Sequence, residues 1–189
     1  MQMEIIGIDE VGRGPLAGPV VVACVALPDI MDLKSSGLPL RDSKKLTEKQ
    51  RGAWCAWIKT HKEIKYAVAR SEPTTIDSIN ISQAANRAAY RAYKKVTGNS
   101  SAPALLDAGL RLPKVVPQKA IIKGDEKIPA IALASILAKV ARDGFMERMH
   151  KRYPAYNFKE NKGYGTKEHY KALKRHGACL IHRLTFLKT

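Results

Sequence analysis

The hydrophobic positions predict strands at the start and in the middle of the chain. Residues 4–8 and 19–27 are short apolar runs rich in β-branched side chains, and residues 64–69 alternate apolar with polar side chains. Both patterns are typical of β-strands. Two more strands are expected at residues 104–106 and 119–122, each followed closely by an aspartate.

Helical patterns fill much of the remaining chain. Thr47 and Gln50 have capping-box spacing before an apolar helical face, and a second helix is expected from Pro73, with a buried side that runs to Val96. Residues 129–150 should form a long helix that is buried, because its first half is apolar nearly all round. This order of elements predicts the α/β class, with helices packed on a mixed sheet.

The size and charge of the chain limit the classes of function that are expected of it. The chain has 189 residues, 45% of them hydrophobic, and a formal net charge of +16. We expect one domain over residues 1–189, in which residues from about 151 to 189 form a basic, helical C-terminal extension that contributes to substrate binding. Such a positive field favours a polyanionic partner, and nucleic acid is the first candidate, although many basic proteins bind none.

Cysteine usage and hydropathy indicate where in the cell the protein is expected. The chain has three cysteines, an odd number, and Cys24 and Cys55 lie in apolar surroundings, so a disulfide framework is not expected. No signal segment opens the chain, and no apolar run approaches the roughly 20 residues of a membrane helix. We expect a cytoplasmic protein that does not contact the membrane.

Acidic residues at the ends of predicted strands are the candidates for binding a cation. Asp9 and Glu10 end an apolar strand, where two carboxylates would repel each other unless a cation lies between them. Adjacent strand residues point to opposite faces, so both reach one ion only if the backbone bends at Glu10. The pair alone is equally compatible with an acidic turn.

Two further acids strengthen the hypothesis. Asp107 follows another apolar strand, and Asp125 precedes the long helix, where it could also be a simple charge at a helix start. Four carboxylates at one rim of a sheet would suit Mg²⁺ or Mn²⁺. Two such ions can hydrolyse a phosphodiester without a protein nucleophile.

Several motifs in a fixed order resemble ribonuclease HII. They are GIDEVGRGPLAGPV at residues 7–20, RDSKKL at 41–46, LD at 106–107, KGD at 123–125, ASILAKVARD at 134–143, NKGYGT at 161–166 and HRLTF at 182–186. The resemblance covers nearly the whole chain, from Ile6 to Phe186. It implies a ribonuclease H-like fold, a five-stranded mixed sheet flanked by helices.

The resemblance also implies an activity and its residues. It implies an endonuclease that cuts the RNA strand of RNA–DNA hybrids, and cuts 5′ of single ribonucleotides in duplex DNA, leaving 3′-OH and 5′-phosphate ends. Its roles would be ribonucleotide excision repair and primer removal. The implied catalytic residues, which would bind two Mn²⁺ or Mg²⁺ ions, are Asp9, Glu10, Asp107 and Asp125.

Substrate-binding residues follow from the same motifs. The loop of Gly12, Arg13 and Gly14 is expected to contact the ribose 2′-OH, the group that distinguishes RNA from DNA. Tyr164 resembles the tyrosine that packs on the next deoxyribose. The residues expected at phosphates are Ser43, Lys44 and Lys139. Ala108 and Gly165 depart from the commonest family pattern, where Gly and Pro stand, but leave the neighbouring functional residues intact.

Other hypotheses explain less of the pattern. Asp143, an acid in the long helix, is expected to be structural and paired with a cation such as Arg142. A zinc site at His176, Cys179 and His182 lacks a fourth ligand. Another nuclease of the same fold would not explain the glycine loop, and a binding module without activity would not explain the acids. We expect a monomer without a sliding-clamp motif or an additional N-terminal domain.

Overall fold

The computed structural model describes residues 3–40 and 43–187. Its sheet has the strand order β3-β2-β1-β4-β5. The strands are β1 (Glu4–Val11), β2 (Val20–Pro28), β3 (Lys65–Ser71), β4 (Ala104–Asp107) and β5 (Gln118–Ile121). The first three strands pair antiparallel, whereas β4 pairs parallel with both β1 and β5. The predicted five-stranded mixed sheet is confirmed.

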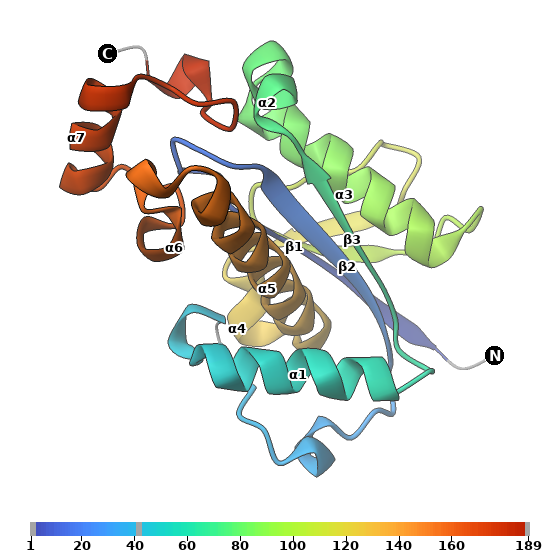
Figure 1. Cartoon of the computed structure of the whole chain (residues 1–189). Coiled ribbons are helices and arrows are strands. Elements are labelled where there is room, and N and C mark those ends of the chain that lie inside the picture. Colours follow the sequence, from blue (N-terminus) through green and yellow to red (C-terminus); the bar gives the residue numbers. More distant parts are fainter. Residues whose placement is uncertain (1–2, 41–42, 188–189) are drawn as a thin grey trace.

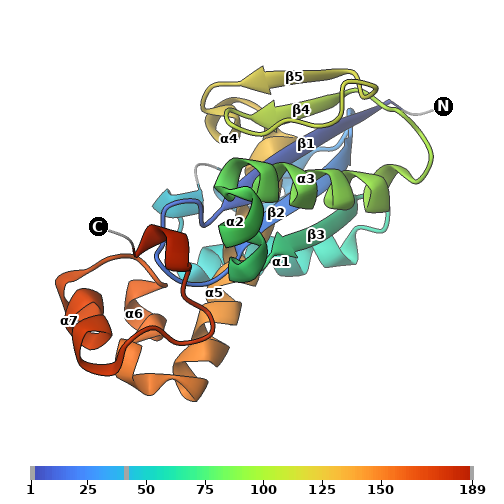
Figure 2. The same ribbon diagram turned by 90° about the horizontal axis from the view of Figure 1, so that it is seen from above.

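Helices cover both faces of this sheet (Figures 1 and 2). They are α1 (Glu48–Thr60), α2 (Pro73–Ile79), α3 (Ile81–Thr97), α4 (Gly124–Lys127), α5 (Pro129–Arg152), α6 (Phe158–Asn161) and α7 (Lys167–His176). Val20, Val22 and Cys24 pack in the cluster of α3, whereas Val21, Ala23 and Val25 pack in that of α1 and α5. The second strand is almost wholly apolar because both of its faces are buried.

Two local predictions have opposite outcomes. The capping box of Thr47 and Gln50 is present at the start of α1. The single helix expected from Pro73 to Val96 is wrong, because the chain forms α2 and α3 with a break at Asn80. Asn80 has a φ of 65°, and its side chain accepts a hydrogen bond from the backbone N–H of Gln83. An asparagine cap therefore starts a new helix inside a continuous apolar pattern.

The helix α5 approaches β1 unusually closely. A Cβ atom on Gly7 would lie 2.3 Å from the carbonyl carbon of Ala130, so only glycine permits this contact. The approach brings the buried face of α5 against the strand that carries Asp9.

The last quarter of the described chain packs against the end of α5 (Figure 1). A third apolar cluster joins Ala17, Phe145 and Met146 to Tyr156, Phe158 and Ile181. An isolated bridge pairs Ala17 with His182, which ties the C-terminal segment to the loop after β1. Among residues 3–40 and 43–187, no helix is long and apolar enough to span a bilayer.

Candidate active site

Asp9 and Glu10 lie within β1 and share one site. The strand continues to Val11, with Glu10 in register opposite Val22 of β2, so both acids belong to a paired stretch of strand. On its other side, β1 pairs with β4 only from Ile6 to Ile8. Past that point β1 has a free edge beside the end of β4. Carboxylate oxygens of Asp9, Glu10 and Asp107 all lie within 4.8 Å of one another there.

The surroundings of Asp9 oppose its ionisation. The residue is 5% exposed. Burial raises its pKa from 3.8 to about 8, and the neighbouring Glu10 and Asp107 carboxylates add to this effect. A hydrogen bond with Ser135 acts in the opposite direction without cancelling it.

Glu10 is also difficult to ionise and has an unpartnered oxygen. Burial, together with the charge of Asp107, raises its pKa from 4.5 to about 7, although Arg13 opposes the change. Arg13 Nη1 lies 3.5 Å from Glu10 Oε1. The other oxygen, Oε2, is buried and has no hydrogen-bond partner. A buried carboxylate oxygen without a donor, in a group of three acids, fits a divalent cation.

Asp107 links β4 to the segment that carries Asp125. Its Oδ1 accepts a hydrogen bond of 2.8 Å from the backbone N–H of Gly124. Lys123 has a φ of 54°, in the left-handed region, and α4 begins immediately after it. Asp125 therefore lies in the first turn of α4 and lines the same cavity as the other acids, although the close group of ligand oxygens comprises only the first three.

One cavity of about 510 Å³ brings every predicted site residue together. Those residues are Asp9, Glu10, Gly12, Arg13, Gly14, Ser43, Lys44, Asp107, Asp125, Lys139 and Tyr164. Arg41 and Asp42, which begin one of the motifs, lie outside the described residues.

Sequence reasoning missed a buried serine in this cavity. Ser135 lies on α5, where its hydroxyl is 2.8 Å from that of Ser43 and also reaches Asp9. It therefore connects one predicted phosphate-contacting residue to the acid group. The available signal was a polar side chain in the apolar half of the long helix, one turn before Lys139.

Asp143 has the structural role that was expected of it, with different partners. It pairs with Lys139 at 2.8 Å and with Arg51 of α1 at 3.9 Å. The neighbouring Arg142 instead donates to the carbonyls of Pro19, Ala17 and Lys162. Lys139 is thus held at the cavity by a carboxylate on the same helix.

Two buried arginines fix the loop that follows β1. Arg183 donates to the carbonyls of Gly12, Arg13 and Gly18 at 2.6, 2.8 and 2.9 Å. Burial, followed by the charge of Arg142, lowers the pKa of Arg183 to about 9. Both arginines belong to motifs quoted above, but their sequence context gave no sign of these contacts.

The two glycines of the loop differ in the space around their α-carbons. Gly12 has a φ of +97°, and a Cβ atom there would lie 2.2 Å from Arg142 Nε. A Cβ atom on Gly14 would meet nothing within 4 Å. Gly12 is thus required by the fold, whereas Gly14 leaves space at the cavity.

Tyr164 is exposed at the cavity and backed by a cation. Tyr164 is 46% exposed, and the Arg142 guanidinium lies 5.9 Å from the centroid of the Tyr164 ring. The backbone carbonyl of Tyr164 lies 2.8 Å from His169 Nδ1. An exposed ring on an anchored backbone can pack against a sugar or base.

The histidines near the C-terminus pair with each other. His182 Nε2 lies 3.0 Å from His169 Nε2, and His182 Nδ1 accepts from the backbone N–H of Cys179. Burial and the neighbouring His169 lower the pKa of His182 to about 4. Among the described residues, the one group with metal-ligand spacing is the acidic one, so a zinc site here has no support.

The comparisons with known proteins agree with these features. The family model for ribonuclease HII matches residues 6–189. The chain is 51% identical over 187 residues to ribonuclease HII of Desulfitobacterium hafniense (strain DSM 10664 / DCB-2), a match that covers 97% of this chain and 68% of that protein.

Solved structures show the same fold. The chain matches one from the PCNA:RNase HII complex of Archaeoglobus fulgidus with a TM-score of 0.75 and 26% identity, covering 98% of this chain and 96% of that one. The ribonuclease H2 of Pyrococcus horikoshii OT3 also matches with a TM-score of 0.75 and 26% identity, covering 97% and 93%.

Proposed function

The chain belongs to the ribonuclease HII family, hydrolytic nucleases that cleave the RNA strand of RNA–DNA hybrids, and we propose that it also cuts 5′ of single ribonucleotides in duplex DNA. The observation that carries this proposal is the group of carboxylates within 4.8 Å of one another, in the cavity that the Gly12–Gly14 loop also lines. The catalytic residues we propose are Asp9, Glu10, Asp107 and Asp125.

The same four residues would hold the metal. When bound, two Mg²⁺ or Mn²⁺ ions would activate the attacking water and stabilise the departing 3′ oxygen. The unpartnered Oε2 of Glu10 and the raised pKa values of Asp9 and Glu10 support this assignment, because a cation offsets both the missing donor and the repulsion. Hydrolysis would leave 3′-OH and 5′-phosphate ends.

Recognition of the ribonucleotide falls to the loop and to Tyr164. Gly14 has open space in front of its α-carbon, so a ribose can approach the backbone, and the 2′-OH can be distinguished there. Tyr164 would pack on the following deoxyribose. Ser43, Lys44 and Lys139, which line the same cavity, would contact phosphates.

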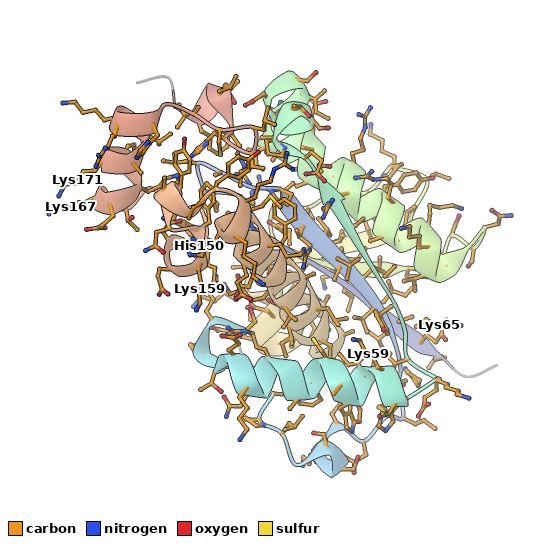
Figure 3. The ribbon with its side chains drawn as sticks, viewed as in Figure 1. Lys59, Lys65, His150, Lys159, Lys167 and Lys171 are labelled. Carbon is orange, nitrogen blue, oxygen red and sulfur yellow. The ribbon has the colours of Figure 1, made fainter. Side chains whose placement is uncertain are left out.

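The C-terminal extension would hold the flanking duplex. Figure 3 shows Lys159 on α6 and Lys167 and Lys171 on α7, on the side of the molecule where the extension lies. Its cations would add affinity that falls as salt rises. We further propose the removal of ribonucleotides and primers as the role in the cell. The Archaeoglobus fulgidus ribonuclease HII was solved in a complex with PCNA, whereas a monomer without a clamp partner stays our prediction for this chain.

A cleavage assay tests this function. The protein is incubated with duplex DNA that carries one ribonucleotide, with an all-DNA duplex, and with a four-way DNA junction, in Mg²⁺ or Mn²⁺. We expect one cut on the 5′ side of the ribonucleotide and none in the other substrates. Asp107→Asn should lose this activity and retain binding, since it removes charge but keeps the side-chain volume. Cleavage of the junction, or a ribonucleotide left intact, would contradict the proposal.

A further inference from the structure

A second cavity lies between α5 and the edge strand β3, apart from the proposed active site. Its volume is about 830 Å³, larger than the 510 Å³ of the acidic cavity. The helix α5 separates the two: Ser135 and Lys139 line the acidic cavity, whereas Val140, Ala141 and Gly144 line this one. In Figure 1, α4 lies behind α5, while β3 lies in front of the sheet's other strands. We call this second cavity the β3 cleft.

About half of the lining of the β3 cleft is apolar. Val21 and Val68 contribute from the sheet, and Val140, Ala141 and Phe145 contribute from α5. A Cβ atom on Gly144 would meet only Arg148 Nη1, at 3.7 Å. Packing therefore does not require a glycine here, and a glycine inside a helix lowers stability relative to alanine. Its effect is to leave the cleft open along α5.

Four exposed cations from three elements surround this lining. Arg70 lies on β3, Arg91 and Lys95 on α3, and Arg148 on α5. The one acid of the lining, Glu72, already pairs with Arg70 at 2.6 Å. Within the part of the chain that the structure describes, Arg91, Lys95 and Arg148 form no salt bridge. The cleft therefore carries a net positive charge that suits an anionic ligand.

The details favour nucleic acid over an acidic peptide. The guanidinium of Arg70 lies 4.9 Å from the centroid of the Phe145 ring, which holds it as a flat surface on which a base can stack. Arg91 donates to the backbone carbonyl of Arg70, and so occupies a main-chain acceptor that a peptide strand added to β3 would need. A cavity of this volume accepts roughly one or two unpaired nucleotides, whereas a duplex hides its bases in the stack.

We propose that the β3 cleft binds an unpaired nucleic-acid strand, with Arg91, Lys95 and Arg148 at its phosphates and a base against the apolar lining. This site is independent of the acids, because it lies on another side of α5. It would hold a single-stranded segment next to, or separate from, the duplex that is cut.

Binding of a fluorescent oligothymidylate, measured by anisotropy over a range of salt concentrations, tests the proposal. In R91A/K95A/R148A, the slope of log affinity against log salt should fall in magnitude by about 2, at about 0.7 for each cation removed. The matched control K34A/K59A/K62A removes three exposed lysines that do not line the cleft, and should keep the wild-type slope and affinity.

A second variant distinguishes the contribution of the cleft to binding from the contribution of surface charge. Gly144→Leu fills the space and removes no cation, so it should weaken binding at least fivefold, whereas Gly144→Ala should bind as the wild type does. Thermal unfolding establishes that each variant is folded. All variants should cleave a short hybrid within twofold of the wild-type rate, because their substitutions lie outside the acidic cavity.

Several results would overturn the proposal. One is that both the triple variant and Gly144→Leu bind the strand as tightly as the wild type does. Another is that the triple variant alone loses affinity for the strand, which would mean that surface charge acts without the cleft. Competition identifies the ligand. If thymidine monophosphate binds as tightly as the strand, or if a polyglutamate peptide of equal charge displaces the strand equally well, the assignment to a nucleic-acid strand is wrong.

Discussion

Replacement of Asp9 by asparagine should stabilise the metal-free protein while it removes activity. Between pH 3.8 and about 8, the folded protein keeps the Asp9 proton that the unfolded chain releases. Unfolding therefore releases a proton in this window, and the stability falls as pH rises through it. Glu10 acts in the same direction between 4.5 and about 7.

The size of the effect follows from the pKa of Asp9. A rise from 3.8 to about 8 destabilises the folded protein by about 3 kcal/mol at pH 6 and about 5 kcal/mol at pH 8. Asparagine keeps the oxygen that accepts a hydrogen bond of 2.7 Å from the backbone N–H of Glu10, but it cannot ionise. Asp9→Asn should therefore avoid most of this loss of stability.

Urea denaturation in EDTA at several pH values measures the difference. The free energy of unfolding of Asp9→Asn should exceed that of the wild type by an amount that grows from near zero at pH 4 to several kcal/mol at pH 8. Glu4→Gln, which removes a carboxylate from the start of the same strand, is the matched control and should follow the wild type. With Mg²⁺ or Mn²⁺ added, the wild type should gain stability and Asp9→Asn should gain less. A difference that does not change with pH would refute the burial of Asp9 beside other acids.

The remaining predictions concern the loop and a helix cap. Gly12→Ala should lower the free energy of unfolding by about 2 kcal/mol, because of its positive φ and its clash with Arg142; a fully stable variant in urea denaturation would contradict this geometry. Gly14→Ala should unfold within about 0.5 kcal/mol of the wild type yet cut at a single ribonucleotide at least tenfold more slowly, since its Cβ would protrude where the ribose approaches; an unchanged kcat/KM would remove Gly14 from recognition. Arg183→Met leaves three loop carbonyls, two of them in buried hydrogen bonds, without their donor and should cost about 3 kcal/mol of stability, and a loss below 1 kcal/mol would show that water replaces the guanidinium. Thr47→Ala should cost about 1 kcal/mol through loss of the capping box, with cleavage unchanged as its control measurement.

Local patterns in the sequence were sufficient for much of this fold. The alternation of residues 64–69 and the apolar run at 19–27 predicted strands, and Thr47 with Gln50 predicted the start of α1. These features depend on neighbours a few positions away, which periodicity and capping describe directly. The acids at strand ends and the ordered motifs identified the family for the same reason, since each motif is contiguous.

Contacts between distant segments had to come from the tertiary structure. Glu10 joins the acid group because β4 stops pairing with β1 after Ile8, which no local pattern in β1 records. Arg183 reaches the carbonyl of Gly12 across 171 positions of the chain, and Ser135 meets Ser43 across 92. The sequence by itself predicted which residues would carry the chemistry and which faces are buried. Only the packing of α5 and the C-terminal segment decided how these residues meet, because a side chain's hydrophobicity specifies that it is buried but not what it contacts.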